Sequence, residues 1–135
     1  GGYIDYLYDE NRWYVDYKTW LSGEGYIDYI CPQIYWSFNS RNTYPFYETL
    51  TRWVNERKNA SIKVYAGLPA YKVNEKLVIS TTESLVDTEW YNPFILADMV
   101  RYGRRAGAEG FIIFDYEDLI DAKNATAVEN MKGEW

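Results

Sequence analysis

Histidine is absent from this sequence of 135 residues, and cysteine occurs once, at Cys31. Without histidine, the chain cannot contain a Ser-His-Asp or Cys-His catalytic apparatus of its own. The commonest zinc ligand is missing as well, and a single cysteine forms neither an internal disulfide nor a cysteine-based structural zinc site. We therefore expect no metal ion and no cofactor.

Long apolar runs and excess positive charge are also missing. No stretch of about 18 apolar residues occurs, so we predict no membrane span. The formal net charge is -6, and a domain of this charge repels the phosphates of nucleic acids and anionic lipids. We expect neither as a partner, and a neutral ligand fits this charge more readily.

Aromatic residues, in contrast, make up 19% of the chain, with 15 Tyr and 6 Trp. Tyr and Trp combine an apolar body with a polar tip, which suits half-exposed positions. Sugar rings present C–H faces edged by hydroxyl groups, so aromatic side chains beside carboxylates and amides form a natural carbohydrate surface. A core rich in large side chains is the alternative interpretation, and composition alone does not decide between the two.

Three short apolar segments bounded by Gly or polar residues predict buried strands: Tyr26–Trp36, Ile62–Leu68 and Phe111–Tyr116. Helical spacing of apolar residues predicts helices around Asn11–Leu21, Tyr44–Lys58, Asn92–Ala106 and Ala125–Lys132. This alternation predicts a single α/β domain of parallel βαβ units with adjacent strands in sequence order. A sheet of three parallel strands has two open edges, so we expect either a piece of a larger barrel or partner chains, such as a homo-oligomer, that cover them.

The segment Gly25–Trp36 carries the most specific motif, GYIDYICPQIYW, and it follows Asp16 and Trp20-Leu21. It resembles a strand of the family 10-like glycosyl hydrolases, a group of bacterial exported hydrolases and lipoproteins. Further segments are similar to later motifs of this family and follow in the same order: Val64–Lys72, Glu89–Pro93 and Gly110–Leu119. Family 18 chitinases have a related layout.

This resemblance implies a (β/α)8 TIM barrel, of which the chain would form the C-terminal part, about strands six to eight. It also implies hydrolysis of glycosidic bonds in a polysaccharide or cell-wall glycan, and a secreted or cell-surface location. The fourth strand, where related barrels keep a catalytic acid, is not among these segments. Asp115 stands where the family usually has serine, which predicts a more acidic site.

Alternation of side chains along a strand sorts the first segment into two faces. One face becomes polar toward its end: Tyr29, Cys31, Gln33 and Tyr35. The other is apolar and suits packing under helices: Ile30, Pro32, Ile34 and Trp36. Gln33 and Tyr35 can both donate to and accept from sugar hydroxyls, and packing inside the barrel is their alternative role.

Four further residues complete the predicted substrate-binding set: Trp36, Tyr71, Lys72 and Trp90. Lys72 could instead pair with Glu117. Trp90 could line the cleft, which we favour, or staple the following helix.

Asp115 and Glu117 are the candidate catalytic residues. If the extended geometry of the third strand continues, they align with Phe111 and Ile113 and reach the C-terminal mouth, where barrel active sites lie. Glycoside hydrolysis uses two carboxyl groups about 5–9.5 Å apart, and alternate residues of a strand are about 6.5 Å apart. In the alternative interpretation one carboxylate binds substrate hydroxyls, while the other is solvated or caps the next helix with Asp118.

Three functions therefore stay open. The leading hypothesis is a segment of a glycoside hydrolase. The others are a barrel that binds carbohydrate without catalysis and a domain for protein assembly.

Overall fold

The computed structural model describes residues 15–39, 44–80 and 85–135. The first four residues of the predicted first helix, 11–14, lie outside this part of the chain. The helices are α1 (Tyr17–Trp20), α2 (Phe46–Glu56), α3 (Ile95–Ala106), α4 (Tyr116–Ile120) and α5 (Ala125–Lys132), and the strands are β1 (Tyr29–Ile30), β2 (Lys63–Pro69), β3 (Leu77–Ser80), β4 (Leu85–Asp87) and β5 (Gly110–Phe114). In the described ranges, no helix has the length and apolar character needed to cross a membrane.

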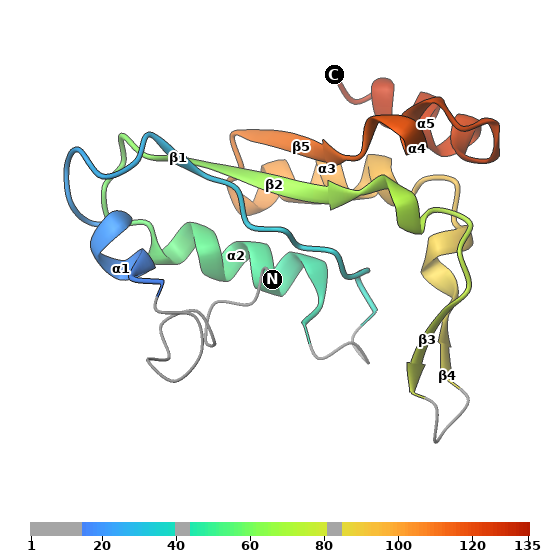
Figure 1. The fold of residues 1–135 in the computed structure, drawn as a ribbon, viewed down its shortest axis with the longest axis horizontal. Helices are drawn as coiled ribbons and strands as arrows, with labels where there is room; N and C mark the ends of the chain where they lie inside the picture. The colour runs from blue at the N-terminus through green and yellow to red at the C-terminus, as the bar shows by residue number, and fades with distance from the viewer. Residues whose placement is uncertain (1–14, 40–43, 81–84) are drawn as a thin grey trace.

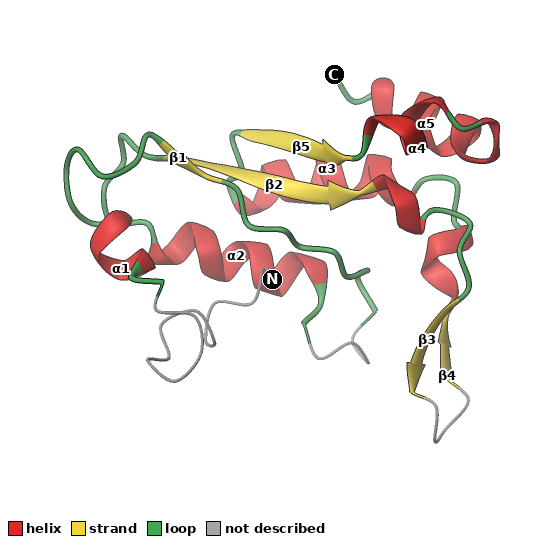
Figure 2. Cartoon of the chain, viewed as in Figure 1, coloured by secondary structure: helices red, strands yellow, loops and turns green. Residues whose placement is uncertain are grey.

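The central sheet has three parallel strands in the order β1-β2-β5 (Figure 1). This confirms the predicted parallel pairing in sequence order. β3 and β4 form a separate antiparallel hairpin, which was not predicted and which stands apart from the central sheet (Figure 2). It falls within residues 74–89, which lack the apolar alternation and turn residues that identify a hairpin from sequence.

β1 is much shorter than the predicted strand Tyr26–Trp36, because regular pairing with β2 stops after Ile30. The chain returns to β2 further on, where Gln33 bridges Gly67. There the Ile34 amide donates to the Gly67 carbonyl at 3.2 Å, and the Gly67 amide donates to the Pro32 carbonyl at 3.0 Å. The segment is thus extended and held against β2 at a single further point.

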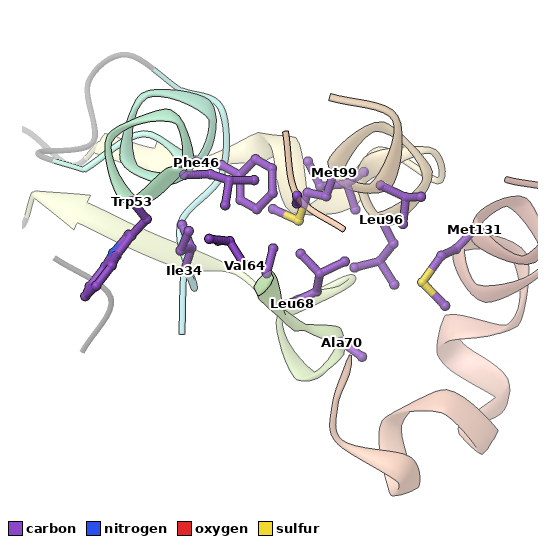
Figure 3. Packing of buried hydrophobic residues seen from close by; sticks show 14 of the residues in the cluster. Ile34, Phe46, Trp53, Val64, Leu68, Ala70, Leu96, Met99 and Met131 are labelled. Atoms are coloured by element: carbon purple, nitrogen blue, oxygen red, sulfur yellow. The ribbon is translucent and has the colours of Figure 1, made fainter. Parts of the chain in front are cut away.

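Helices α2 and α3 lie side by side against one face of this sheet (Figure 1). On that face β2 buries Val64, Ala66 and Leu68 completely. Figure 3 shows Phe46 of α2 together with Leu96 and Met99 of α3 packing around Val64 and Leu68. Burial of these apolar side chains stabilises the fold.

The opposite face of the sheet has no helix over it among the described residues. Its side chains are large and exposed: Tyr29 at 52%, Ile112 at 46% and Phe114 at 50%. In the predicted first strand, Tyr26–Trp36, Pro32 and Ile34 are buried and Gln33 is exposed, as the alternation predicts. In β5 the predicted orientation was wrong: Phe111 and Ile113 pack toward the helices, and Ile112 and Phe114 occupy the open face.

The predicted helix limits hold at the C-terminal end of α3 but not at its start. Gly107 ends α3 with a positive φ of 101°, as expected of a glycine stop. Asn92 does not cap this helix: its side-chain oxygen accepts from the Phe94 amide at 3.0 Å in a tight turn, and α3 begins at Ile95.

Gly67 provides the first testable prediction. A Cβ at this position would lie 3.1 Å from the Pro32 carbonyl oxygen and 3.2 Å from the Gln33 Cα. These are backbone atoms of the neighbouring segment, which cannot move aside independently. We expect Gly67→Ala to lower the free energy of unfolding by about 1–3 kcal/mol, the usual cost of overpacking.

Urea unfolding measured by circular dichroism tests this expectation. Gly133→Ala is the matched control, because Gly133 has helical φ and ψ angles and a Cβ there would meet no atom closer than 3.3 Å. Equal unfolding midpoints for the two variants would contradict the close approach at Gly67.

Candidate functional site

The C-terminal ends of the three parallel strands bring three aromatic rings together. Tyr35, Tyr71 and Phe114, which we call the aromatic cluster, come from the segment after β1, the turn after β2 and the end of β5. The Tyr35 ring is nearly parallel to Phe114, with centroids 6.1 Å apart and planes at 27°. Tyr71 meets both rings edge-on, at centroid distances of 5.9 Å to Tyr35 and 6.2 Å to Phe114.

The cluster is open to solvent on one side, since Tyr71 is 37% exposed and Phe114 is 50% exposed. Burial raises the pKa of the Tyr35 phenol, and the neighbouring Tyr71 and Cys31 raise it further. Burial also raises the pKa of the Tyr71 phenol. Phenols ordinarily ionise near pH 10, so both stay neutral at physiological pH, where each can donate and accept one or more hydrogen bonds.

The structure therefore brings together two of the predicted site residues, Tyr35 and Tyr71, and adds Phe114, which sequence reasoning missed. Gln33 is exposed on the same side of its segment, one alternation before Tyr35. Cys31 is half-buried on that side, and burial raises the pKa of its thiol. The edge is thus lined by phenols, an amide and an apolar ring.

Asp115 and Glu117 do not continue the strand, contrary to the prediction. β5 ends at Phe114, the Phe114–Asp115 peptide bond is cis, and α4 begins at Tyr116. The Asp115 carboxylate accepts from the Asp118 amide at 3.3 Å and caps α4, which was the alternative role considered for it. Glu117 is exposed in the first turn of α4, where a negative charge is favourable because of the helix dipole. The two carboxyl groups are therefore not aligned along one strand face.

Lys72 is turned inward. Its ammonium group donates to the backbone carbonyl of Tyr35 and lies 5.5 Å from the centroid of the Trp90 ring and 5.8 Å from that of Tyr71. Burial lowers the pKa of this ammonium, and the carboxylate of Asp87 acts in the opposite direction. Lys72 does not form the ion pair with Glu117 that the sequence analysis gave as its alternative role.

The two tryptophans of the predicted set lie away from the open edge. Trp90 is only 1% exposed, and its indole N–H donates to Asp87 Oδ2 at 3.1 Å. It therefore lies beneath the surface instead of lining a cleft. Trp36 is half-buried against the core and meets the Tyr44 ring edge-on at 5.2 Å.

Sequence reasoning also missed two carboxylates that hold the segment after β1. Asp87, which is 3% exposed, accepts from the Ser37 hydroxyl at 2.5 Å. Glu89 accepts from the Phe38 amide at 2.8 Å. Burial and the charge of Asp87 raise the pKa of Glu89, and hydrogen bonds such as that from Phe38 lower it. No local signal in residues 74–89 indicated these partners, which lie about fifty positions earlier in the chain.

The described part of the chain contains no group of three or more Cys, Asp or Glu side chains placed to hold a metal ion. The aromatic cluster and Gln33 offer stacking on neutral rings and hydrogen bonding by phenols and an amide. Such a surface suits a neutral, hydroxyl-rich ligand.

Comparison with known proteins identifies the family of the chain. The model of the family described as glycosyl hydrolase-like 10 matches residues 3–85, and the chain belongs to that family. Its relatives include glycosyl hydrolase YngK of Bacillus subtilis (strain 168), 34% identical over 110 residues, which cover 78% of this chain and 19% of that protein.

Glycosyl hydrolase DigH of Escherichia coli O6:H1 is 38% identical over 133 residues, covering 95% of this chain and 28% of that protein. Its counterpart in Escherichia coli K12 is 41% identical over 69 residues, covering 50% of this chain and 15% of that protein. The chain thus spans between about a fifth and just over a quarter of the length of the first two relatives. Their names support a glycosidase-type function at this coarse level.

The capping role of Asp115 gives the second prediction. We expect Asp115→Ala to lower the free energy of unfolding by about 0.5–2 kcal/mol, because the start of α4 loses its hydrogen-bond acceptor. Asp115→Asn keeps an acceptor and should retain most of the stability. Glu117→Ala, an exposed change two residues on, should stay within about 0.5 kcal/mol of the unchanged chain. Thermal and urea unfolding measure all three, and an Asp115→Ala chain as stable as Glu117→Ala would refute the capping role.

Proposed function

We propose that this chain is the C-terminal part of a (β/α)8 barrel, about strands six to eight, and supplies carbohydrate-binding residues to a glycoside hydrolase. The aromatic cluster at the C-terminal edge of the parallel sheet carries this proposal. Barrel enzymes place their active sites at this end of the strands. Aromatic faces beside neutral phenols match the C–H faces and hydroxyl groups of sugar rings.

The uneven covering of the sheet supports the barrel. An open parallel sheet of the doubly wound type has helices on both faces, whereas a barrel sheet has helices outside and packed side chains inside. Here α2 and α3 cover one face, and the other presents Tyr29, Ile112 and Phe114 to solvent. We propose that the rest of the barrel covers this face in the whole protein, and that a homo-oligomer partner would do so if the chain occurred alone.

The proposed reaction is hydrolysis of glycosidic bonds in a polysaccharide or cell-wall glycan by the whole protein, at a secreted or cell-surface location. Hydrolysis of this kind uses two carboxyl groups. In this chain Asp115 is engaged in capping α4, so we propose that this segment mainly binds and orients the sugar. Essential acids would then lie on other strands.

Replacement of Tyr35 in the full-length protein tests the binding role. We expect Tyr35→Ala to weaken binding of a soluble oligosaccharide roughly two- to tenfold, as loss of about 0.5–1.5 kcal/mol of aromatic stacking implies. Tyr35→Phe keeps the ring and isolates the contribution of the phenol. Isothermal titration calorimetry with cellohexaose and chitohexaose measures both.

Tyr26→Ala is the matched control, because Tyr26 is an exposed tyrosine (58%) outside the aromatic cluster. The Tyr26→Ala protein should bind both oligosaccharides with the affinity of the unchanged protein. Equal affinities for the Tyr35→Ala and Tyr26→Ala proteins would count against a carbohydrate site at the aromatic cluster.

Replacement of Glu117 separates binding from catalysis. Glu117→Gln keeps the shape of the side chain and removes its charge. We expect affinity to fall modestly, because an exposed carboxylate accepts hydrogen bonds from sugar hydroxyls more strongly than an amide does. Turnover should persist, because Glu117 is solvated in α4 and is not aligned with a second carboxylate. If the variant bound substrate normally but lost its turnover by orders of magnitude, Glu117 would be an acid or nucleophile and our assignment would be wrong.

A further inference from the structure

The Tyr35 backbone lies just beyond the point where the sheet holds its segment. In the described residues, backbone pairing of this segment with β2 ends with the hydrogen bond from the Ile34 amide to Gly67. Tyr35 is the next residue, and its ring forms one side of the aromatic cluster. The position of the ring therefore depends on interactions other than those of the sheet.

Three side-chain hydrogen bonds to this stretch come from one connection, the chain between β2 and α3. The Phe46 amide of α2 also donates to the Ser37 carbonyl at 2.8 Å. Lys72 donates to the Tyr35 carbonyl, Asp87 accepts from the Ser37 hydroxyl at 2.5 Å, and Glu89 accepts from the Phe38 amide at 2.8 Å. Three charged side chains of this connection thus hold three nearby points of the segment after β1. We call Lys72, Asp87 and Glu89 the charged clamp.

Lys72 is the member of the clamp that acts on Tyr35 directly. Its ammonium is half-buried and lies near the Trp90 and Tyr71 rings. Burial of a charged group is costly unless partners compensate for it. Here the Tyr35 carbonyl, the faces of the two rings and the charge of Asp87 provide that compensation. The ammonium is thus engaged by groups of the chain itself.

We infer that Lys72 is a positioning residue for carbohydrate binding: it fixes the backbone of Tyr35 so that the Tyr35 ring stays against Tyr71 and Phe114, and it does not contact the sugar. This inference rests on the proposed function. It differs from direct binding by Lys72 in one measurable respect. A residue that acts through the Tyr35 ring has no further effect on binding once that ring is removed.

A double-mutant cycle in the full-length protein tests this with Lys72→Met, which keeps the length of the side chain and removes the charge. With cellohexaose and chitohexaose as probes, we expect Lys72→Met alone to weaken binding roughly two- to tenfold, like Tyr35→Ala. In the Tyr35→Ala background, the same change should weaken it by less than about 1.5-fold, because coupled residues are not additive. Lys123→Met is the control, since Lys123 forms an exposed ion pair with Glu75 at 3.1 Å and such pairs contribute little.

Hydrogen exchange measured by mass spectrometry tests the clamp without any ligand. Lys72→Met should increase exchange in the peptide covering residues 34–39, and Lys123→Met should not. Unchanged exchange in the Lys72→Met protein would overturn the inference. So would a loss of affinity that is equally large with and without the Tyr35 ring, because Lys72 would then contact the sugar itself.

The remaining outcomes separate the two proposals. If Tyr35→Ala weakens binding and Lys72→Met does not, the positioning role fails and the carbohydrate site stands. If Tyr35→Ala has no effect on either probe, the proposed site fails, and the inference fails with it.

Discussion

The arrangement of the whole sheet depends on the burial of one face of β2. Val64, Ala66 and Leu68 are fully buried beneath α2 and α3, and a fully buried Val or Leu side chain contributes about 1.5–3 kcal/mol. Because side chains alternate along a strand, this burial directs Tyr65 and Gly67 to the opposite face. The same constraint decides which side of the molecule is open and which strand ends carry exposed rings.

The sequence predicts β2 well because apolar and polar side chains alternate along it, and only one of its faces is apolar. Val64, Ala66 and Leu68 are apolar, while Lys63 and Tyr65 carry polar groups, so only one face can be buried. In β5 the sequence does not show which face is buried. Its central residues, Phe111 to Phe114, are apolar on both faces, and periodicity cannot tell them apart. The decision comes from α3, where Gly103 leaves room for the Phe111 ring: a Cβ there would lie 2.5 Å from it.

The site was predictable where local chemistry determined it. Tyr35 and Tyr71 follow strands, and the parallel order brings them to one edge. The misplacement of Glu117 came from extending β5 too far, although Asp115 followed three residues later by Asp118 indicates a helix start. Asp87 could not have been found in this way, because its partner Ser37 is 50 positions distant and the contact exists only in the folded chain.

Four charged side chains near the C-terminal ends of the strands are engaged with the structure of this segment itself. Asp115 caps α4, and Lys72, Asp87 and Glu89 hold the segment after β1. The groups left open at this end are the exposed Glu117 of α4 and the aromatic cluster, with phenols whose raised pKa keeps them uncharged. A buried charge must keep its partners to avoid a large desolvation cost, so these polar contacts fix geometry in a way that apolar packing would not. An edge built like this is preorganised for stacking, and a rigid platform loses less conformational entropy when a ligand binds.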